Sequence, residues 1–230
     1  PIQFLRELKI LYSLRYPSIV KFIGFSEKDF NEENYPVIVM EYLQNGSLYQ
    51  ILNDNNKHLN NTKKMIILIG VALGIKYLHI HGIIHRDLKL QNILLDDELY
   101  PKICDFGDSK PINLEFNLSS DVGTPLYMAP EVSNNTEYSY PADVYSYGMI
   151  AYYIYSGLTP SKSPFPNCSK IKNPQISNFV KDLINEDPDK RPTFEQIVTL
   201  FLNGKEKTWL DNVDEKEIEK YLLHKFGLKI

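Results

Sequence analysis

The sequence contains few cysteines and no long apolar run, and each shortage argues against a class of protein. Its two cysteines, Cys104 and Cys168, lie far apart without metal-ligand spacing, unlike those of a disulfide scaffold or a cysteine-rich zinc site. The aromatic-rich apolar stretch 144–155 is too short to span a bilayer, which needs roughly 20 residues. Residues 1–6 lack the apolar run of a signal peptide. We therefore expect a cytoplasmic protein with reduced thiols and no membrane segment.

Positive charge is not in excess either. The 230 residues carry a formal net charge of −4 with a pI near 5.8, so no basic footprint for nucleic acid or an anionic membrane is present. Apolar residues make up 43% and charged residues 23%, which is ordinary for a soluble globular protein. The chain opens at Pro1 rather than at a methionine. We therefore expect it to be a piece of a longer protein.

Local patterns predict a strand-bearing N-terminal part followed by a mainly helical part. Helix-forming patterns cover residues 2–14, 63–80, 142–156, 174–185, 193–203 and 213–226. Runs rich in Val, Ile, Phe and Tyr predict strands at 19–25, 37–42, 83–84, 93–95 and 102–104. Ser47 follows a turn and can cap a further helix, and Asp214 with Glu217 forms a capping-box-like pair before the last one.

Chemically active residues concentrate between residues 84 and 107. Asp87, Lys89 and Asn92 lie within one short polar segment between apolar strands, and Asp105 follows Asn92 by 13 residues at the end of another strand. Charges beside buried strands are costly unless they serve a purpose. An amide and a carboxylate that meet across a hairpin also make an oxygen site suited to Mg²⁺.

The order of these residues resembles that of the eukaryotic protein kinases. Residues 85–92 match the catalytic loop H-R-D-x-x-x-x-N, and residues 105–107 match D-F-G. The segments 39–48, 123–131, 143–148 and 187–192 are similar to further kinase elements. The resemblance implies an α+β, two-lobed kinase fold. Its divisions are an incomplete N-terminal β lobe at 1–42, a mainly helical C-terminal lobe at 43–203 and a helical tail at 204–230.

The resemblance also implies a role for each active residue. Asp87 would accept or orient the proton of a substrate hydroxyl, and Lys89 would offset the charge of the transferred phosphoryl group. Asn92 and Asp105 would hold the Mg²⁺ ions that bridge the phosphates of ATP. Because such chemistry depends mostly on positioning and charge stabilisation, a fixed constellation matters more than any single acid.

An adenine site follows from the same resemblance. Glu41 and Leu43 would offer hinge backbone groups to the base, with Met40 guarding the pocket behind it. Leu48 and Leu94 would help to form the apolar column on which the base sits. A second apolar column, typical of active kinases, matches Leu11, Phe22, His85 and Phe106.

The substrate class is narrowed by two residues. Lys89, two positions after Asp87, and Thr124 in the segment Gly-Thr-Pro follow the serine/threonine pattern. The chain is further similar to the tyrosine-kinase-like group, whose members mostly phosphorylate Ser and Thr. We therefore expect protein substrates with Ser or Thr acceptors, and regulatory proteins as possible partners. A phosphate on Ser119 or Ser120 could pair with Arg86 and order the segment; alternatively, these serines only solvate a surface loop.

Other polar residues have structural interpretations. We expect an ion pair between Glu131 and Arg191 that braces the helical lobe. Asp143 is expected to anchor the backbone of the catalytic loop. His85 is expected to pack on Phe106 without transferring protons, and Cys104 to be a buried small apolar residue.

The sequence also departs from the kinase pattern. The Gly-rich phosphate loop and the strand lysine that pairs with the glutamate at Glu7 are not in this chain, so strand 37–42 is expected to have an open apolar edge. The region 157–187 is short, 161–173 has no convincing helix, and Asp108 is atypical after D-F-G. These departures leave open an alternative, a pseudokinase-like binding or scaffold module without efficient phosphotransfer. A small-molecule phosphotransferase is a distant third hypothesis.

Overall fold

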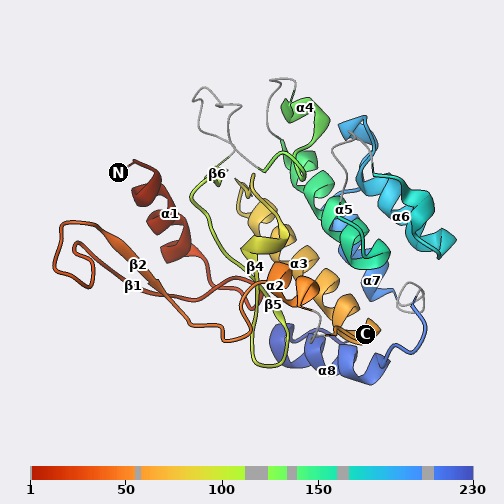
Figure 1. Cartoon of the computed structure of the whole chain (residues 1–230), viewed down its shortest axis with the longest axis horizontal. Coiled ribbons are helices and arrows are strands. Elements are labelled where there is room, and N and C mark those ends of the chain that lie inside the picture. The colour runs from red at the N-terminus through yellow and green to blue at the C-terminus, as the bar shows by residue number, and fades with distance from the viewer. Residues whose placement is uncertain are drawn as a thin grey trace.

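A helical body carries a smaller N-terminal unit that projects to one side of it (Figure 1). This computed structural model describes residues 2–54, 58–111, 124–133, 139–159, 166–203 and 210–229. The projecting unit consists of helix α1 (Ile2–Ser13) and the antiparallel strands β1 (Phe22–Ser26) and β2 (Val37–Met40). The predicted helix 2–14 is therefore confirmed to within one residue. The remaining elements form the body.

The predicted strand 19–25 is wrong at its start. β1 begins only at Phe22, and a register irregularity follows between Phe22 and Gly24. The preceding residues turn toward the body instead: Ile103 N donates to Ser18 O (2.7 Å), and Val20 N donates to Ile103 O (2.9 Å). This segment thus joins the projecting unit to the body by backbone hydrogen bonds, a long-range pairing that local propensity does not report.

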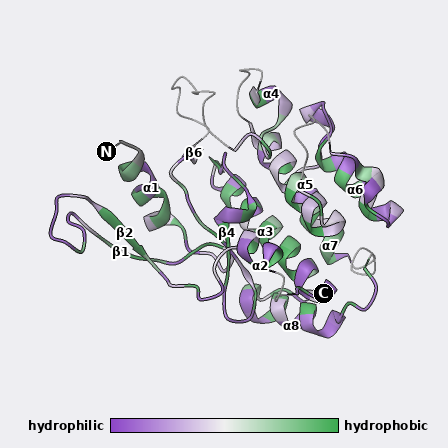
Figure 2. Ribbon diagram, in the orientation of Figure 1, coloured by the Kyte–Doolittle hydropathy of each residue, from purple (hydrophilic) through white to green (hydrophobic). Residues whose placement is uncertain are grey.

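The β1–β2 hairpin has exposed apolar side chains. Ile23, Phe25 and Val39 are all exposed, and Figure 2 shows the hydrophobic colour on β2, whereas the loop that closes the hairpin is hydrophilic. Within the described ranges, β2 pairs with β1 and with no other strand. The expected open apolar edge is therefore confirmed for the part of the chain that the structure describes.

The centre of the body is formed by two helices that are buried along most of their length. They are α3 (Asn61–Ile80) and α5 (Tyr140–Ser156). A helix that is apolar on nearly all faces belongs in a core rather than at a surface. The Tyr147 hydroxyl donates to the Leu68 carbonyl (3.0 Å), so even the polar end of this large ring is satisfied between the two helices. In the described residues no helix is both long and apolar enough to cross a membrane.

Shorter helices cover this centre. α2 (Leu48–Asn53) begins at Ser47, which forms a capping box with Gln50, as its place after a turn predicted. α6 (Pro174–Leu183) packs on α5 and α7 (Phe194–Leu202) packs on α3, whereas α4 (Pro130–Ser133) is a single turn (Figure 1). The region expected to lack a helix lies partly outside the described residues. Its described end, 166–173, contains only the 3₁₀ turn Cys168–Lys170.

Two short antiparallel strand pairs position the polar segment that contains Asp87, Lys89 and Asn92. β3 (Ile83–Ile84) pairs with β6 (Lys110–Pro111), and β4 (Ile93–Leu95) pairs with β5 (Pro101–Ile103), both antiparallel. The sequence predicted β3, β4 and, shifted by one residue, β5. It missed β6, because two residues give no periodicity to detect.

The last helix, α8 (Glu215–Phe226), docks on the body (Figure 1). Its Tyr221 is 2% exposed and packs on Tyr100 with ring centroids 4.5 Å apart. A Cβ on Gly70 of α3 would lie 2.2 Å from the Tyr221 hydroxyl, so this close approach requires glycine. At the other end, Phe226 contacts Tyr16, which follows α1 (centroids 5.4 Å apart). The tail helix therefore contacts both the body and the segment that leads from α1.

The capping box predicted at the start of α8 is only half formed. Asp214 accepts from Glu217 N (3.2 Å), but the Glu217 carboxylate turns to Lys63 of α3 at 2.7 Å. Asp214 N donates instead to the Thr62 hydroxyl (2.8 Å). Tertiary partners from α3 thus replace the second local hydrogen bond. As predicted, the helix ends at Gly227, whose φ of 68° is in the left-handed region.

The docking of α8 predicts a large difference between two substitutions on this one helix. Tyr221→Ala should lower the free energy of unfolding by about 3–5 kcal/mol, because it leaves a cavity against Tyr100 and α3. Leu223→Ala, a half-exposed position, should cost less than about 1 kcal/mol. Urea denaturation of the two variants measures both values. Equal small effects would contradict the packing of α8 on the body.

Candidate active site

The predicted catalytic loop joins β3 to β4 and has an unusual backbone. Arg86 has φ 70°, and Asp105, just after β5, has φ 64°. Residues other than glycine seldom adopt this left-handed region, and where they do so the surrounding structure must hold them. The backbone conformation of this loop is therefore determined by its contacts rather than by local conformational preference.

The main contact is the buried carboxylate of Asp143 on α5. Its Oδ2 accepts from His85 N (2.9 Å), and its Oδ1 accepts from Arg86 N (3.0 Å). The His79 ring, from the end of α3, contributes Nε2 at 2.8 Å from Oδ2. Burial tends to raise the pKa of Asp143, but these hydrogen bonds and the neighbouring histidines outweigh it and leave the pKa below its usual value. The expected anchoring of the loop by Asp143 is confirmed.

Sequence reasoning missed His79 in this arrangement. The signal was weak but present: a histidine in the last turn of a helix whose other positions are mostly apolar needs a buried partner. That partner lies 64 residues away on another helix, so local patterns could not name it.

The structure brings Asp87, Lys89, Asn92 and Thr124 into one hydrogen-bonded network. Lys89 forms an ion pair with Asp87 and donates to Thr124 Oγ1 (3.0 Å). Asp87 Oδ1 accepts from both the backbone N and the hydroxyl of Thr124, each at 3.1 Å. Asp87 is 8% exposed, so these contacts fix a nearly buried carboxylate at the edge of solvent. Thr124, which the sequence marked only for substrate class, is thus a structural member of the network.

Asn92 and Asp105 lie at the same end of the β4–β5 hairpin, as the sequence predicted. Cys104 N, next to Asp105, donates to Asn92 O (3.0 Å). The Asn92 amide Nδ2 donates to Asp87 O (2.9 Å) and to Asp87 Oδ2 (3.1 Å), and no donor of the described residues binds its carbonyl Oδ1. The Asp105 carboxylate is exposed and has no hydrogen bond or ion pair with the described residues. Within the part of the chain that the structure describes, one amide oxygen and one carboxylate therefore remain free at this end of the hairpin.

The surrounding charge favours a cation at this place. Burial raises the pKa of Glu7, and the negative charge of Asp105 raises it further. Burial likewise raises the pKa of Asp108, and the negative charges of Asp87 and Asp105 raise it further. Such shifts mark negative charge that is not fully neutralised. In the described ranges no three acidic, histidine or cysteine side chains converge to hold a metal alone, but Mg²⁺ often takes only one or two protein ligands and completes its shell with phosphates and water.

The structure places Glu7, whose strand lysine is not in this chain, near the turn after β5. The backbone of Phe106 acts to lower the pKa of the Glu7 carboxyl against the larger effect of burial, so α1 lies close to the turn that carries Asp105. Phe106 is fully buried and packs on His85 with ring centroids 5.4 Å apart, which confirms that expected contact. Leu11 is also buried and Phe22 is half-buried; whether all four residues form the second apolar column stays a prediction.

The predicted hinge residues lie between β2 and α2. The side chain of Glu41 accepts from Lys21 N (2.8 Å) and pairs with Lys102 (2.9 Å), a lysine that the sequence did not single out. These contacts hold the side chain of Glu41 in place and leave its carbonyl available. Leu43 O accepts from Gly46 N (3.1 Å), which closes the turn before α2.

The two leucines assigned to the adenine column differ in accessibility. Leu94 on β4 is only partly buried, so a planar base can reach it. Leu48 is fully buried. It can support the column from within the body but offers no surface to a ligand.

The two remaining structural expectations are also met. Arg191 donates to both carboxylate oxygens of Glu131, at 2.6 and 2.8 Å, and its side chain is fully buried. This bidentate pair braces the start of α7 against α4. By contrast, Ser119 and Ser120, the proposed phosphorylation positions, lie outside the described residues.

Burial of the thiol next to this site has a testable consequence. It raises the pKa of Cys104 to about 12, and the negative charge of Asp105 adds to the effect. At pH 8 only roughly 1 in 10⁴ of such thiols is ionised, whereas an ordinary cysteine with a pKa near 8.5 is about one quarter thiolate. Iodoacetamide should therefore leave Cys104 unmodified in the native protein at pH 8 and alkylate it in urea, as mass spectrometry of its peptide would show. Rapid native alkylation would contradict this burial.

Known proteins are similar to this chain over most of its length. The protein kinase domain family matches residues 2–201. A probable serine/threonine-protein kinase of Dictyostelium discoideum is 34% identical over 212 residues, which are 86% of this chain and 23% of that protein. Serine/threonine-protein kinase CTR1 of Arabidopsis thaliana is 35% identical, covering 86% of this chain and 26% of that protein. Serine/threonine/tyrosine-protein kinase HT1, also of Arabidopsis thaliana, is 32% identical, covering 86% and 54%.

The chain thus spans only part of each of these relatives, about a quarter in the first two. The matched residues include the projecting unit and the helical body, up to α7. The α+β, two-lobed kinase fold with an incomplete N-terminal lobe, expected from the motifs, is therefore confirmed. The chain belongs to the protein kinase family.

Proposed function

We propose that the protein transfers the γ-phosphate of ATP to Ser and Thr hydroxyls of protein substrates. The observation that carries this proposal is the network of Asp87, Lys89, Asn92 and Thr124 beside the free carboxylate of Asp105. It combines a fixed carboxylate, a cation and two oxygen ligands, which are part of what phosphoryl transfer requires. The relatives named as serine/threonine kinases support the same chemistry.

Each residue of the network has a role that fits its contacts. Asp87 is held by hydrogen bonds on both oxygens, so it can orient a substrate hydroxyl and take up its proton without moving. Lys89 lies against Asp87 and can offset negative charge on the transferred group. Asn92 Oδ1 and the Asp105 carboxylate would hold Mg²⁺. When bound, the metal supplies charge neutralisation between the nucleotide phosphates.

The adenine would lie between the hinge and β4. The carbonyl of Glu41 and the amide of Leu43 would bind its polar edge, and Leu94 would contact its face. Leu48, which is buried, would support Leu94 from within the body. This arrangement corresponds to a partial N lobe at 1–42, a C lobe at 43–203 and a helical tail at 204–230, a division that we propose together with a cytoplasmic location.

Two features support Ser and Thr as acceptors and protein substrates as their source. Lys89 contacts Thr124, so the two residues that follow the serine/threonine pattern in sequence also meet in space. The segment from Thr124 onward leads into α4 and the Glu131–Arg191 pair, which fixes its position next to Asp87. The alternative, a binding or scaffold module, has less support because Asp87, Lys89, Asn92 and Asp105 are all present.

Phosphate transfer tests the proposal directly. The protein is incubated with Mg²⁺, γ-labelled ATP and a generic basic acceptor protein, and label on serine and threonine is measured. Asp87→Asn should reduce transfer by at least about 100-fold, the usual contribution of a positioned base. Asp97→Asn, an exposed carboxylate on the β4–β5 turn, should leave transfer unchanged and serves as the matched control.

Two outcomes would count against the proposal. Transfer that survives Asp87→Asn would refute the assignment of the site. Mg²⁺-dependent binding of ATP without any transfer by the unsubstituted protein would instead favour the scaffold alternative.

A further inference from the structure

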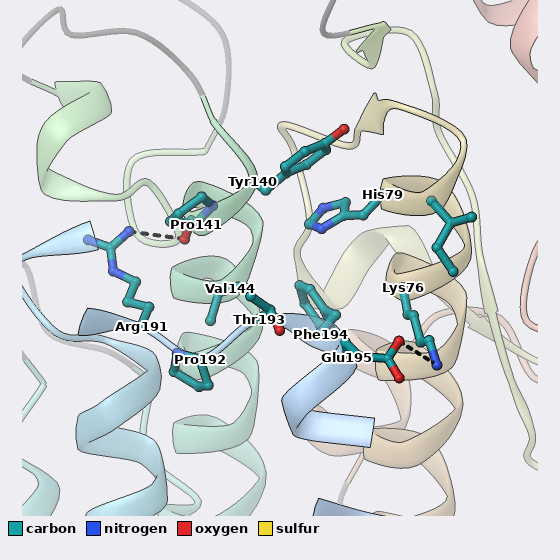
Figure 3. A pocket seen from close by; sticks show the side chains of 11 residues that line it. Lys76, His79, Tyr140, Pro141, Val144, Arg191, Pro192, Thr193, Phe194 and Glu195 are labelled. Carbon is teal, nitrogen blue, oxygen red and sulfur yellow. Dashed lines mark hydrogen bonds and ion pairs between the residues drawn. The ribbon is translucent and has the colours of Figure 1, made fainter. Parts of the chain in front are cut away.

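A cavity of about 260 Å³ lies in the body, between the end of α3 and the starts of α5 and α7 (Figure 3). None of the proposed catalytic, metal or adenine residues lines it. Most of its wall is apolar and comes from three separate segments of the chain: Ile80, Tyr140, Pro141, Val144, Pro192 and Phe194. The volume is slightly below the usual range for drug-sized ligands, so it suits a molecule of one or two fused rings.

The charged groups that reach this cavity are already paired. Lys76 and Glu195 form an ion pair at 2.7 Å across one side (Figure 3). Arg191 is held by Glu131, as described above. A charged ligand would therefore lose its hydration without finding a free counter-charge, which is unfavourable. The cavity selects for a neutral molecule.

His79 contributes a further polar atom to the wall. The ring lies near Tyr140 (centroids 4.5 Å apart) and edge-on to Phe194 (5.2 Å). Because a carboxylate only accepts hydrogen bonds, the bond to Asp143 places the proton on Nε2. In the neutral ring, Nδ1 is then an acceptor, and it has no hydrogen bond with the described residues. A ligand that enters can donate one hydrogen bond to it.

We propose that this cavity binds a small neutral aromatic molecule with one N–H or O–H donor, and that its occupancy alters the catalytic loop through His79 and Asp143. The aromatic preference follows from the rings of Tyr140, Phe194 and His79, against which a flat molecule can stack or pack edge-on. The coupling follows from Asp143, which holds His79 and the loop backbone with the same carboxylate. His79 is thus a positioning residue, and a ligand that shifts its ring shifts a hydrogen bond of the anchor.

Binding is tested with indole and benzofuran, two flat bicyclic molecules that differ in the N–H donor. Each is titrated into the full chain while NMR follows the His79 ring signal. Indole should give a saturable shift, and benzofuran should bind about three- to tenfold more weakly, as the loss of one neutral hydrogen bond predicts. Benzoate, a charged aromatic, should bind more weakly than either.

Two variants locate the site. Ile80→Asp places a charge at the rim, where Ile80 is already exposed, and Val144→Phe fills the interior. Both should weaken indole binding at least tenfold, and Ile80→Asp remains informative if Val144→Phe does not fold. Leu223→Asp, the same kind of change at a half-exposed position of α8, is the control and should leave binding unchanged.

Hydrogen exchange of the His85 and Arg86 amides tests the coupling without any measurement of activity. Saturating indole should change their exchange rates in the unsubstituted protein and not in Ile80→Asp. No saturable indole binding, binding unaffected by both cavity variants, or a stronger response to benzoate would overturn the site. Indole binding with unchanged exchange at His85 and Arg86 would overturn the coupling.

Discussion

The active site depends on one buried carboxylate. Asp143 uses two oxygens to hold three donors, the backbone amides of His85 and Arg86 and the ring of His79. The left-handed backbone at Arg86 is costly by itself, and these hydrogen bonds offset that cost. Since Asp87 directly follows the two anchored amides, its place in the network with Lys89, Asn92 and Thr124 is set from α5. A buried ionised group is acceptable there because hydrogen bonds reach both of its oxygens.

This anchor requires a rigid support, which the two central helices supply. α3 and α5 are buried on most faces, and large rings such as Tyr147 complete their contact with satisfied hydrogen bonds. Close packing extends outward: Gly70 lets α8 approach α3, and Gly148 lies where a Cβ would be 2.8 Å from Leu183 of α6. α8 lies beyond the residues matched by the kinase family, yet it packs on the same core. The helical tail is therefore part of the folded unit.

Local chemistry allowed much of this structure to be predicted. The helices were recognisable because apolar spacing, capping residues such as Ser47 and stops such as Gly227 act within a few positions. The motif around Asp87 identified the family for the same reason. What the sequence did not reveal depends on contacts between distant segments: the pairing of Ser18–Val20 with β5, the partner of Glu217 on α3, and the position of His79 between Asp143 and the cavity. Those contacts carry no local signal, and the two-residue strand β6 is too short for one.

The central claim, that the Asp143 carboxylate holds the catalytic loop, is tested most directly by amide hydrogen exchange in Asp143→Asn. The two loop amides bind different oxygens of Asp143, and an amide side chain has only one acceptor oxygen. The amide of His85 or that of Arg86 must therefore lose its partner. The account predicts faster exchange at the His85 or Arg86 amide, with α6 unchanged, and no such effect in the exposed control Asp182→Asn. Full protection of both loop amides in Asp143→Asn would contradict it.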